Sequence, residues 1–131
     1  MSEKKSVFLE THNINNRATG LGTFNYELIK GLNQLSFDNL QIHLNAGKPE
    51  LLKDEFSDKF KYHKYRSFHR YKPFRPLAKF DLWHSVNQNS KLEPRTDTKY
   101  LLTIHDVNFV EEISADMNHK RNRLFLEKLN K

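Results

Sequence analysis

The stretch SVFLETHNINNRATGLGTFNYELIKGLNQL, residues 6–35, decides the fold of this chain. Its start, residues 7–9, is a short apolar run with the length and composition of a β-strand. Its end carries apolar residues at the spacing of one helical face, namely Phe24, Leu28, Leu32 and Leu35. The polar loop between them closes on Gly20 and Gly22, and we expect Thr23 to cap the helix. The stretch therefore predicts a strand, a glycine-containing loop and a helix.

A glycine-containing turn from a strand into a helix gathers bare N–H groups and the positive end of a helix dipole at one point. That point suits a phosphate or a sugar hydroxyl, although two glycines are also what a tight turn alone requires. The dinucleotide fingerprint is not met, because Asn25 occupies the third glycine position. The expected second strand, residues 40–46, also ends without an acid for a ribose. A nicotinamide or flavin enzyme is therefore disfavoured.

Composition narrows the class of protein. The 131 residues include 22 Lys and Arg against 16 Asp and Glu, a net charge of +6. This length predicts one domain, and the charge favours anionic partners such as nucleotide-sugar phosphates, acidic lipid surfaces or nucleic acid. The absence of cysteine excludes a disulfide framework and thiolate metal sites, which fits the cytosol. We expect neither a signal peptide nor a membrane-spanning helix, because MSEKK leads straight into a strand and no apolar run reaches about 20 residues.

The rest of the chain alternates between predicted strands and helices. Apolar patterning indicates strands at residues 39–46, 60–65, 80–85 and 99–105, helices at residues 49–56 and 114–131, and loops at residues 67–76 and 86–98. This alternation predicts an α/β fold, a Rossmann-like doubly wound parallel sheet of about five strands with helices on both faces. Ligands of such sheets bind beyond the carboxyl ends of the strands, where the strand order reverses. We therefore expect the polar residues at those ends to lie at one edge.

Two of these strand ends carry histidines. His105 and Asp106 follow the most apolar strand directly, where a histidine is placed to meet a ligand. The alternative is that Asp106 caps a following helix and His105 has a structural role. His84 and Ser85 end the preceding strand, and the amides at residues 87–89 suit hydroxyl-rich ligands. That loop can equally be a solvated connection.

Other chemistries are disfavoured by their missing motifs. None of the seven histidines has zinc-site spacing, and neither a nucleophile elbow nor a phosphate-binding P-loop is present. The most basic part is residues 59–75, KFKYHKYRSFHRYKPFR, in which seven Lys or Arg residues interleave with six aromatic ones. Such a mixture can serve single-stranded nucleic acid or an anionic membrane surface. For residues 60–65 we favour a simpler interpretation, in which alternate aromatic side chains enter the core and the lysines stay solvated.

Three segments together resemble a known family. RATGLGTFNYELIKGL at residues 17–32, DLWHS at residues 81–85 and LLTIHD at residues 101–106 recur in this order and at these intervals in GT-B-fold glycosyltransferases. The chain is most similar to the retaining enzymes of glycosyltransferase family 4, and the similarity covers nearly all of it. The resemblance implies two Rossmann-like domains facing each other across a cleft. The amino-terminal domain mostly binds the acceptor and the carboxyl-terminal domain binds the nucleotide sugar.

The resemblance also implies roles for individual residues. The loop of Thr19, Gly20, Leu21 and Gly22 would approach the donor phosphates. His105 would be the catalytic cleft histidine that contacts the transferred sugar or its phosphate. The acceptor side would be lined by Arg17, His84, Ser85, Gln88 and Asp106. No metal and no cofactor are expected, only a nucleotide-sugar co-substrate.

The expected function follows from this resemblance. Residues 1–131 would be the amino-terminal, acceptor-side domain of a hexosyltransferase-type enzyme of polysaccharide biosynthesis, moving a sugar from a nucleotide diphosphate to a hydroxyl acceptor with retention. The acceptor would be a glycan, a lipopolysaccharide or a lipid-linked molecule. The sequence given ends before the family's final strand of this domain and contains no donor domain, so we expect this part alone to be inactive. A cytoplasmic location, peripheral on the inner face of the plasma membrane through residues 66–75, is expected. The alternative is a nucleic-acid-binding module that uses residues 59–75.

Overall fold

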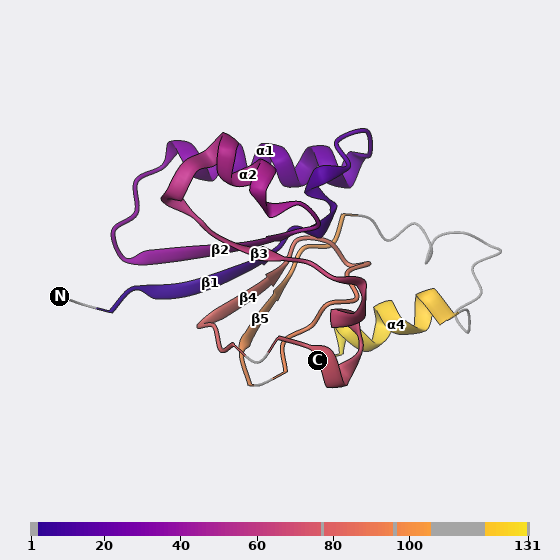
Figure 1. The fold of residues 1–131 in the computed structure, drawn as a ribbon. Helices are drawn as coiled ribbons and strands as arrows, with labels where there is room; N and C mark the ends of the chain where they lie inside the picture. The colour runs from indigo at the N-terminus through magenta and orange to yellow at the C-terminus, as the bar shows by residue number, and fades with distance from the viewer. Residues whose placement is uncertain (1–2, 77, 96, 106–119, 131) are drawn as a thin grey trace.

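The computed structural model describes residues 3–76, 78–95, 97–105 and 120–130 of the chain. Five strands form one sheet in the order β3-β2-β1-β4-β5, and every neighbouring pair is parallel (Figure 1). Their bounds are β1 Lys5–Glu10, β2 Leu40–Ala46, β3 Lys61–Lys64, β4 Leu82–Ser85 and β5 Lys99–Leu102. The predicted α/β class and the parallel sheet of about five strands are confirmed.

Helices α1 (Gly20–Gln34) and α2 (Pro49–Phe56) lie side by side over one face of this sheet (Figure 1). A third described helix, α4 (Lys120–Leu129), coincides with part of the helix predicted at residues 114–131. It lies apart from the other two, and the Lys128 ammonium donates to the Gln88 carbonyl over 3.2 Å. Short 3₁₀ turns complete the chain: η1 His12–Asn15, η2 Ser57–Lys59, η3 Ser67–Arg70 and η4 Lys72–Phe74.

The start of α1 corrects one expectation. Thr19, and not Thr23, is the N-cap, because its hydroxyl accepts from the Gly22 N–H over 3.1 Å. Thr23 already lies in the first turn, and its hydroxyl donates to the Arg17 carbonyl over 3.0 Å. The prediction was wrong because Gly20 and Gly22 were assigned to the loop. Both have ordinary negative φ values and belong to the helix.

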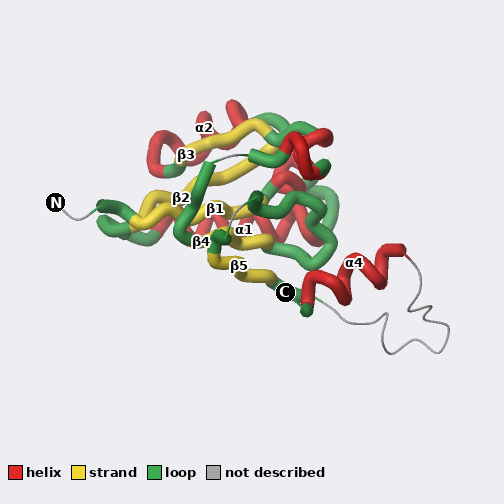
Figure 2. The backbone as a smooth tube through the Cα atoms, turned by 90° about the horizontal axis from the view of Figure 1, so that it is seen from below, coloured by secondary structure: helices red, strands yellow, loops and turns green. Residues whose placement is uncertain are grey.

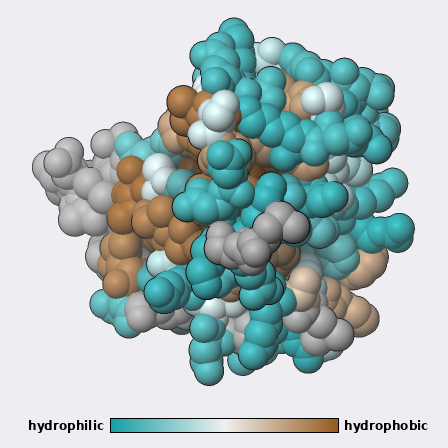
Figure 3. Space-filling model, turned by 90° about the vertical axis from the view of Figure 1, so that its left-hand side faces the viewer, coloured by the Kyte–Doolittle hydropathy of each residue, from teal (hydrophilic) through white to brown (hydrophobic). Residues whose placement is uncertain are grey.

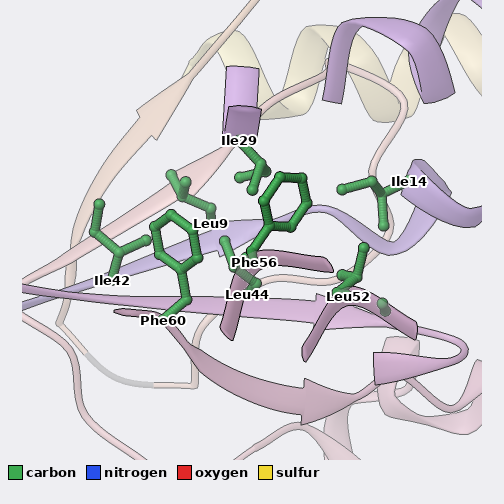
Figure 4. Packing of buried hydrophobic residues seen from close by; sticks show 9 residues of the cluster. Leu9, Ile14, Ile29, Ile42, Leu44, Leu52, Phe56 and Phe60 are labelled. Atoms are coloured by element: carbon green, nitrogen blue, oxygen red, sulfur yellow. The ribbon is translucent and has the colours of Figure 1, made fainter. Parts of the chain in front are cut away.

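The larger hydrophobic core fills the space between the sheet and the two helices α1 and α2 (Figure 4). Its fully buried members are Leu9, Ile14, Ile29, Ile42, Leu44, Ala46, Leu52, Phe56 and Phe60. Burying each of the larger side chains contributes roughly 1.5–3 kcal/mol to stability. Phe60 is buried and Tyr62 packs beside it, whereas Lys61 and Lys64 are exposed. The simpler interpretation of residues 60–65 is therefore confirmed.

A second, aromatic cluster lies on the opposite face of the sheet. Side chains alternate along a strand, so Phe8 on β1 points away from the core that holds Leu9. Phe8 stacks on Trp83 with ring centroids 4.0 Å apart, and Phe80 and Leu92 complete the cluster. Loops, and not α1 or α2, supply the rest of this layer.

The strand order places the switch point beside β1. From β1 the chain moves outward through β2 to β3 and then returns across the sheet to β4 and β5, an order that Figure 2 shows along the tube. The loops that follow β1 and β4 therefore diverge between these two neighbouring strands, and ligands of open parallel sheets bind at such a position. The side of the molecule at the amino ends of the strands is mainly hydrophilic, with hydrophobic side chains at the surface in some places (Figure 3). The site is built on the other side.

Candidate functional site

The polar loops predicted to meet do lie at one edge of the sheet. His84 belongs to β4, and His105 follows the neighbouring parallel strand β5, so both are at the carboxyl side. The His105 N–H donates to Oε1 of Gln88 over 3.1 Å, and Nε2 of its ring lies 2.8 Å from the Val86 carbonyl oxygen. These two hydrogen bonds tie the end of β5 to the loop after β4. The expected meeting of the loops is confirmed.

The hydrogen bonds of His105 fix the chemistry of its ring. A carbonyl oxygen only accepts, so Nε2 carries a proton and donates to Val86. The other nitrogen, Nδ1, has no hydrogen-bond partner among the residues that the structure describes. It can accept when the ring is neutral and donate when the ring is charged. Because the side chain is exposed, His105 offers this nitrogen to a ligand.

Phe24 connects His105 to the start of α1. The edge of one ring meets the face of the other, with centroids 4.6 Å apart and planes at 84°. Phe24 is itself 38% exposed and belongs to neither hydrophobic cluster. The sequence pattern had assigned Phe24 to the buried face of the helix. Instead it stands beside the histidine at the surface of the site.

The first turn of α1, the helix that carries Phe24, has unpaired donors. The N–H groups of Gly20 and Leu21 have no acceptor among the described residues, as is usual for a helix start. The Thr19 cap occupies the next N–H, that of Gly22. Two free N–H groups and the positive end of a helix of 15 residues are groups with which an anion could interact.

Gly20 and Gly22 differ in the space around them. A Cβ on Gly22 would lie 1.8 Å from the Asn16 carbonyl oxygen and 3.0 Å from that of Asn13. Gly22 therefore allows the turn η1 to pack directly on α1. A Cβ on Gly20 would meet nothing within 4 Å. Its open surroundings leave room for a ligand to approach the helix start.

The residues expected on the acceptor side mostly hold the loops in place. His84 is half-buried, shares a hydrogen bond of 2.8 Å with the Thr103 hydroxyl, and has a pKa lowered by burial. Ser85 is fully buried and its hydroxyl accepts from the Tyr100 hydroxyl over 3.0 Å. Gln88 is 7% exposed and receives the His105 N–H. These contacts position the edge of the sheet around His105.

Arg17, a further expected acceptor residue, makes its side-chain contacts with the helices α1 and α2. The Arg17 guanidinium lies 2.5 Å from Glu55 of α2 and 3.8 Å from the ring centre of Tyr26. It therefore covers the outside of the helical layer. Asp106 lies outside the described residues.

A polar cluster at the end of β1 was not identified from the sequence. Glu10 is 1% exposed, and its Oε1 receives hydrogen bonds from Nδ1 of His12 and, over 3.4 Å, from Nδ2 of Asn45. Burial raises the pKa of Glu10, but the hydrogen bond and charge of His12 outweigh it and leave the pKa below its usual value. Glu10 is thus a buried carboxylate that is ionised at neutral pH. The only sequence signal was an acid that ends an apolar strand, followed two residues later by a histidine.

The basic and aromatic segment forms a separate surface. Three aromatic side chains of residues 66–74 are 43–58% exposed, namely Phe68, Tyr71 and Phe74. Arg66 and Lys72 are exposed between them. The last cation, Arg75, is instead paired with Glu93 over 3.4 Å, and both side chains are 16% exposed. Residues 66–74 therefore present cations and aromatic rings together, without Arg75.

The described residues hold neither a metal-ligand cluster nor a membrane-spanning helix. No three His, Asp or Glu side chains there come together as a metal site would need. No helix within the described ranges is long and apolar enough to span a bilayer. Comparison with known proteins gives no match: no family model, no curated protein and no solved structure matches this chain. The likeness to glycosyltransferase family 4 therefore rests on the three sequence segments alone.

Proposed function

We propose that this chain is the acceptor-side domain of a retaining glycosyltransferase, which transfers a sugar from a nucleotide diphosphate to the hydroxyl of a glycan, lipopolysaccharide or lipid-linked acceptor. The observation that carries the proposal is the ring contact of His105 with Phe24, which brings an exposed imidazole against the helix α1 whose first N–H groups are free. Both lie at the carboxyl edge of a doubly wound sheet, near its switch point. The three segments that resemble the family contain these same residues.

The chemistry proposed for the site is electrostatic. When the bond between the sugar and the diphosphate breaks, negative charge grows on the departing phosphate oxygens. The N–H groups of Gly20 and Leu21, together with the dipole of α1, would stabilise that charge. Nδ1 of His105 would bind a phosphate oxygen or a sugar hydroxyl. Such contacts accelerate the reaction only if they strengthen as the transition state forms.

The test is a transfer assay on the complete gene product. The protein is incubated with radiolabelled nucleotide sugars and a lipid and glycan extract, and label in the acceptor fraction is counted. We expect transfer from one donor, and loss of one contact in His105→Ala should reduce turnover by about 10²–10³. The thermal midpoint should fall only slightly, because the backbone N–H bond of residue 105 to Gln88 is kept and the ring loses one hydrogen bond, to the Val86 carbonyl.

The control for this assay is Lys53→Ala, a change at an exposed residue of α2 outside the site. It should behave as the parent does. Absence of transfer from every nucleotide sugar would refute the proposed function, whereas normal turnover in His105→Ala would refute the role of the histidine only.

We further propose that residues 66–74 bring the enzyme to an anionic membrane surface in the cytoplasm or to a lipid-linked acceptor. Support comes from the exposed rings of Phe68, Tyr71 and Phe74 and from the cations among them. A ring at the level of the lipid headgroups and a cation near anionic lipid both favour such binding. The alternative, a nucleic-acid-binding module, uses the same residues. Tight binding of a single-stranded oligonucleotide that weakens steeply with salt would favour that alternative.

A further inference from the structure

Two side chains with unused hydrogen-bonding groups lie near Tyr65, on the sheet face opposite α1 and α2. Tyr65 packs against the aromatic cluster of that face. The ring of His12 stacks on it, with centroids 4.6 Å apart and planes at 24°. Burial and the charge of Glu10 raise the pKa of Tyr65, whereas the charge of Arg70 on η3 lowers it, so the guanidinium is near the phenol. His12, Tyr65 and Arg70 together form the Tyr65 cluster.

The imidazole of His12 is held by one nitrogen and leaves the other available. Nδ1 is bonded to the Glu10 carboxylate, which can only accept, so Nδ1 carries a proton. Nε2 forms no hydrogen bond with any described residue, and 22% of the His12 side chain is exposed. Glu10 itself is 1% exposed, so an approaching ligand meets the imidazole and not the carboxylate. When the ring is charged, Nε2 is a donor to an anion.

The Tyr65 phenol and the Arg70 guanidinium are donors with unused capacity. Nη2 of Arg70 donates to the Tyr71 hydroxyl over 3.1 Å, but its Nε is buried and has no hydrogen-bond partner among the described residues. The Tyr65 hydroxyl also forms no hydrogen bond within the described ranges, and its raised pKa keeps it protonated at neutral pH. An unpaired buried donor costs free energy that a bound acceptor would recover. These groups suit an anion with several oxygen atoms.

The Tyr65 cluster adjoins the basic and aromatic surface of residues 66–74. Arg66 follows Tyr65 directly and is exposed, and Arg70 belongs to this surface itself. The three aromatic rings of the surface are 43–58% exposed, and such rings sit at the level of lipid headgroups. A phosphate carried by a lipid lies at that same level. The cations of the segment and the net charge of +6 favour its approach.

The buried acid behind this cluster is not required to join β1 to β2. Thr11 already makes that connection, since its N–H donates to Oδ1 of Asn45 over 2.6 Å and its hydroxyl to the Asn45 carbonyl over 2.8 Å. Apolar side chains in place of a buried charged pair are often neutral or stabilising. An ionised Glu10 does, however, hold the His12 ring in one orientation and favour its charged form. Both effects serve the binding of an anion at Nε2.

We propose that the Tyr65 cluster binds the phosphate group of a lipid-linked acceptor; that this ligand is the acceptor rests on the proposed function. The phosphate oxygens accept from the Arg70 guanidinium, from the Tyr65 hydroxyl and from Nε2 of His12. Glu10 stabilises the charged imidazole, and the lipid chain lies along the aromatic rings of residues 66–74. The hydroxyl that reacts belongs to another part of the acceptor, so the phosphate is held away from the reacting atoms.

The test is a binding titration of the chain, followed by ¹H–¹⁵N spectra, with farnesyl diphosphate and with inorganic diphosphate. We expect saturating shifts at the amides of His12, Tyr65 and Arg70, at lower concentrations of farnesyl diphosphate because only this probe reaches the exposed rings. Absence of shifts at His12 and Tyr65 with both probes overturns the proposal. Equal affinity for the two probes overturns the lipid-linked ligand in favour of a soluble phosphate. Tighter binding of a thymidine oligonucleotide at the same residues overturns it in favour of nucleic acid.

Three variants separate this site from a general attraction between charges. Tyr65→Phe keeps the ring on which His12 stacks and removes one donor, so the Kd for farnesyl diphosphate should rise about 2–10-fold. Arg70→Ala removes a charge-assisted hydrogen bond and should raise it about 10–100-fold. Lys64→Ala is the matched control, because Lys64 is an exposed cation of β3 whose side chain alternates away from the face that holds Tyr65. All three should keep the thermal midpoint of a folded chain, and equal losses in Lys64→Ala and Arg70→Ala overturn the proposal.

Failure of this proposal and failure of the proposed function give different results. The binding titration contains no sugar donor, so the phosphate site is measured even in a protein that transfers no sugar. Binding without transfer from any nucleotide sugar would keep the site and overturn its role in holding an acceptor. Transfer to a glycan acceptor, with no binding of either diphosphate at the Tyr65 cluster, would overturn this proposal and keep the proposed function.

Discussion

The contact between α1 and η1 can be tested by adding one methyl group at Gly22. Its Cβ would lie 1.8 Å from the Asn16 carbonyl oxygen and 2.5 Å from the Asn16 carbonyl carbon. Carbon contacts are comfortable at about 3.5 Å, so the turn and the helix must separate by roughly 1.5 Å. All the opposing atoms are backbone and cannot rotate away. The separation also disturbs Ile14, which is fully buried in the core.

We expect Gly22→Ala to lower the free energy of unfolding by about 2–4 kcal/mol, at the upper end of overpacking effects. Gly31→Ala is the matched control, since Gly31 lies in the same helix and its Cβ would meet nothing within 4 Å. That control should stabilise the protein by about 0.5–1 kcal/mol, because alanine favours the helix. Urea unfolding with linear extrapolation measures both. A loss below about 0.5 kcal/mol in Gly22→Ala would refute the described packing of η1 on α1.

Two further predictions concern other parts of the molecule. Nδ1 of His43 lies 2.8 Å from Nε2 of His63, and burial followed by the charges of His63 and Lys61 lowers the pKa of His43 from 6.5 to about 4. The pKa of His43 is lower in the folded protein than in the unfolded chain, so its neutral form contributes fully to the free energy of unfolding above pH 6.5. That free energy should fall by about 1–2 kcal/mol as the pH is lowered toward 4, allowing for solvent screening. Urea midpoints that do not depend on pH between 4 and 6.5 would contradict this. The second prediction concerns the triple variant in which Arg66, Arg70 and Lys72 are replaced by Glu. It should no longer float with anionic vesicles and should behave as the parent does with neutral ones, because each cation contributes about 1 kcal/mol to binding at an anionic surface. Flotation equal to the parent's would count against membrane binding.

The sequence was sufficient for the architecture because the strands are strongly apolar. Runs such as residues 7–9 are typical of a sheet strand, and parallel connections then fix the common direction of the strands. The common direction places the loops after β1, β4 and β5 at one edge. The meeting of His105 with the loop after β4 could therefore be predicted.

The details of the site depend on contacts that periodicity does not contain. The choice between Thr19 and Thr23 as the cap depends on where the helix begins, and both are typical cap residues. The two glycines look alike in sequence, and only the approach of Asn16 distinguishes Gly22 from Gly20. The environment of Glu10 requires the register of β1 against β2, which brings Asn45 beside it.

The central claim is that the helix start and His105 form a site for the diphosphate of a nucleotide sugar. It is tested most directly by ¹H–¹⁵N amide spectra of the chain titrated with a nucleotide diphosphate sugar such as UDP-glucose at millimolar concentration. We predict shifts that saturate and are concentrated at the amides of Gly20, Leu21 and His105, with the amides at the amino ends of the strands unaffected. Shifts confined to residues 66–74, or none at the start of α1, would contradict the claim.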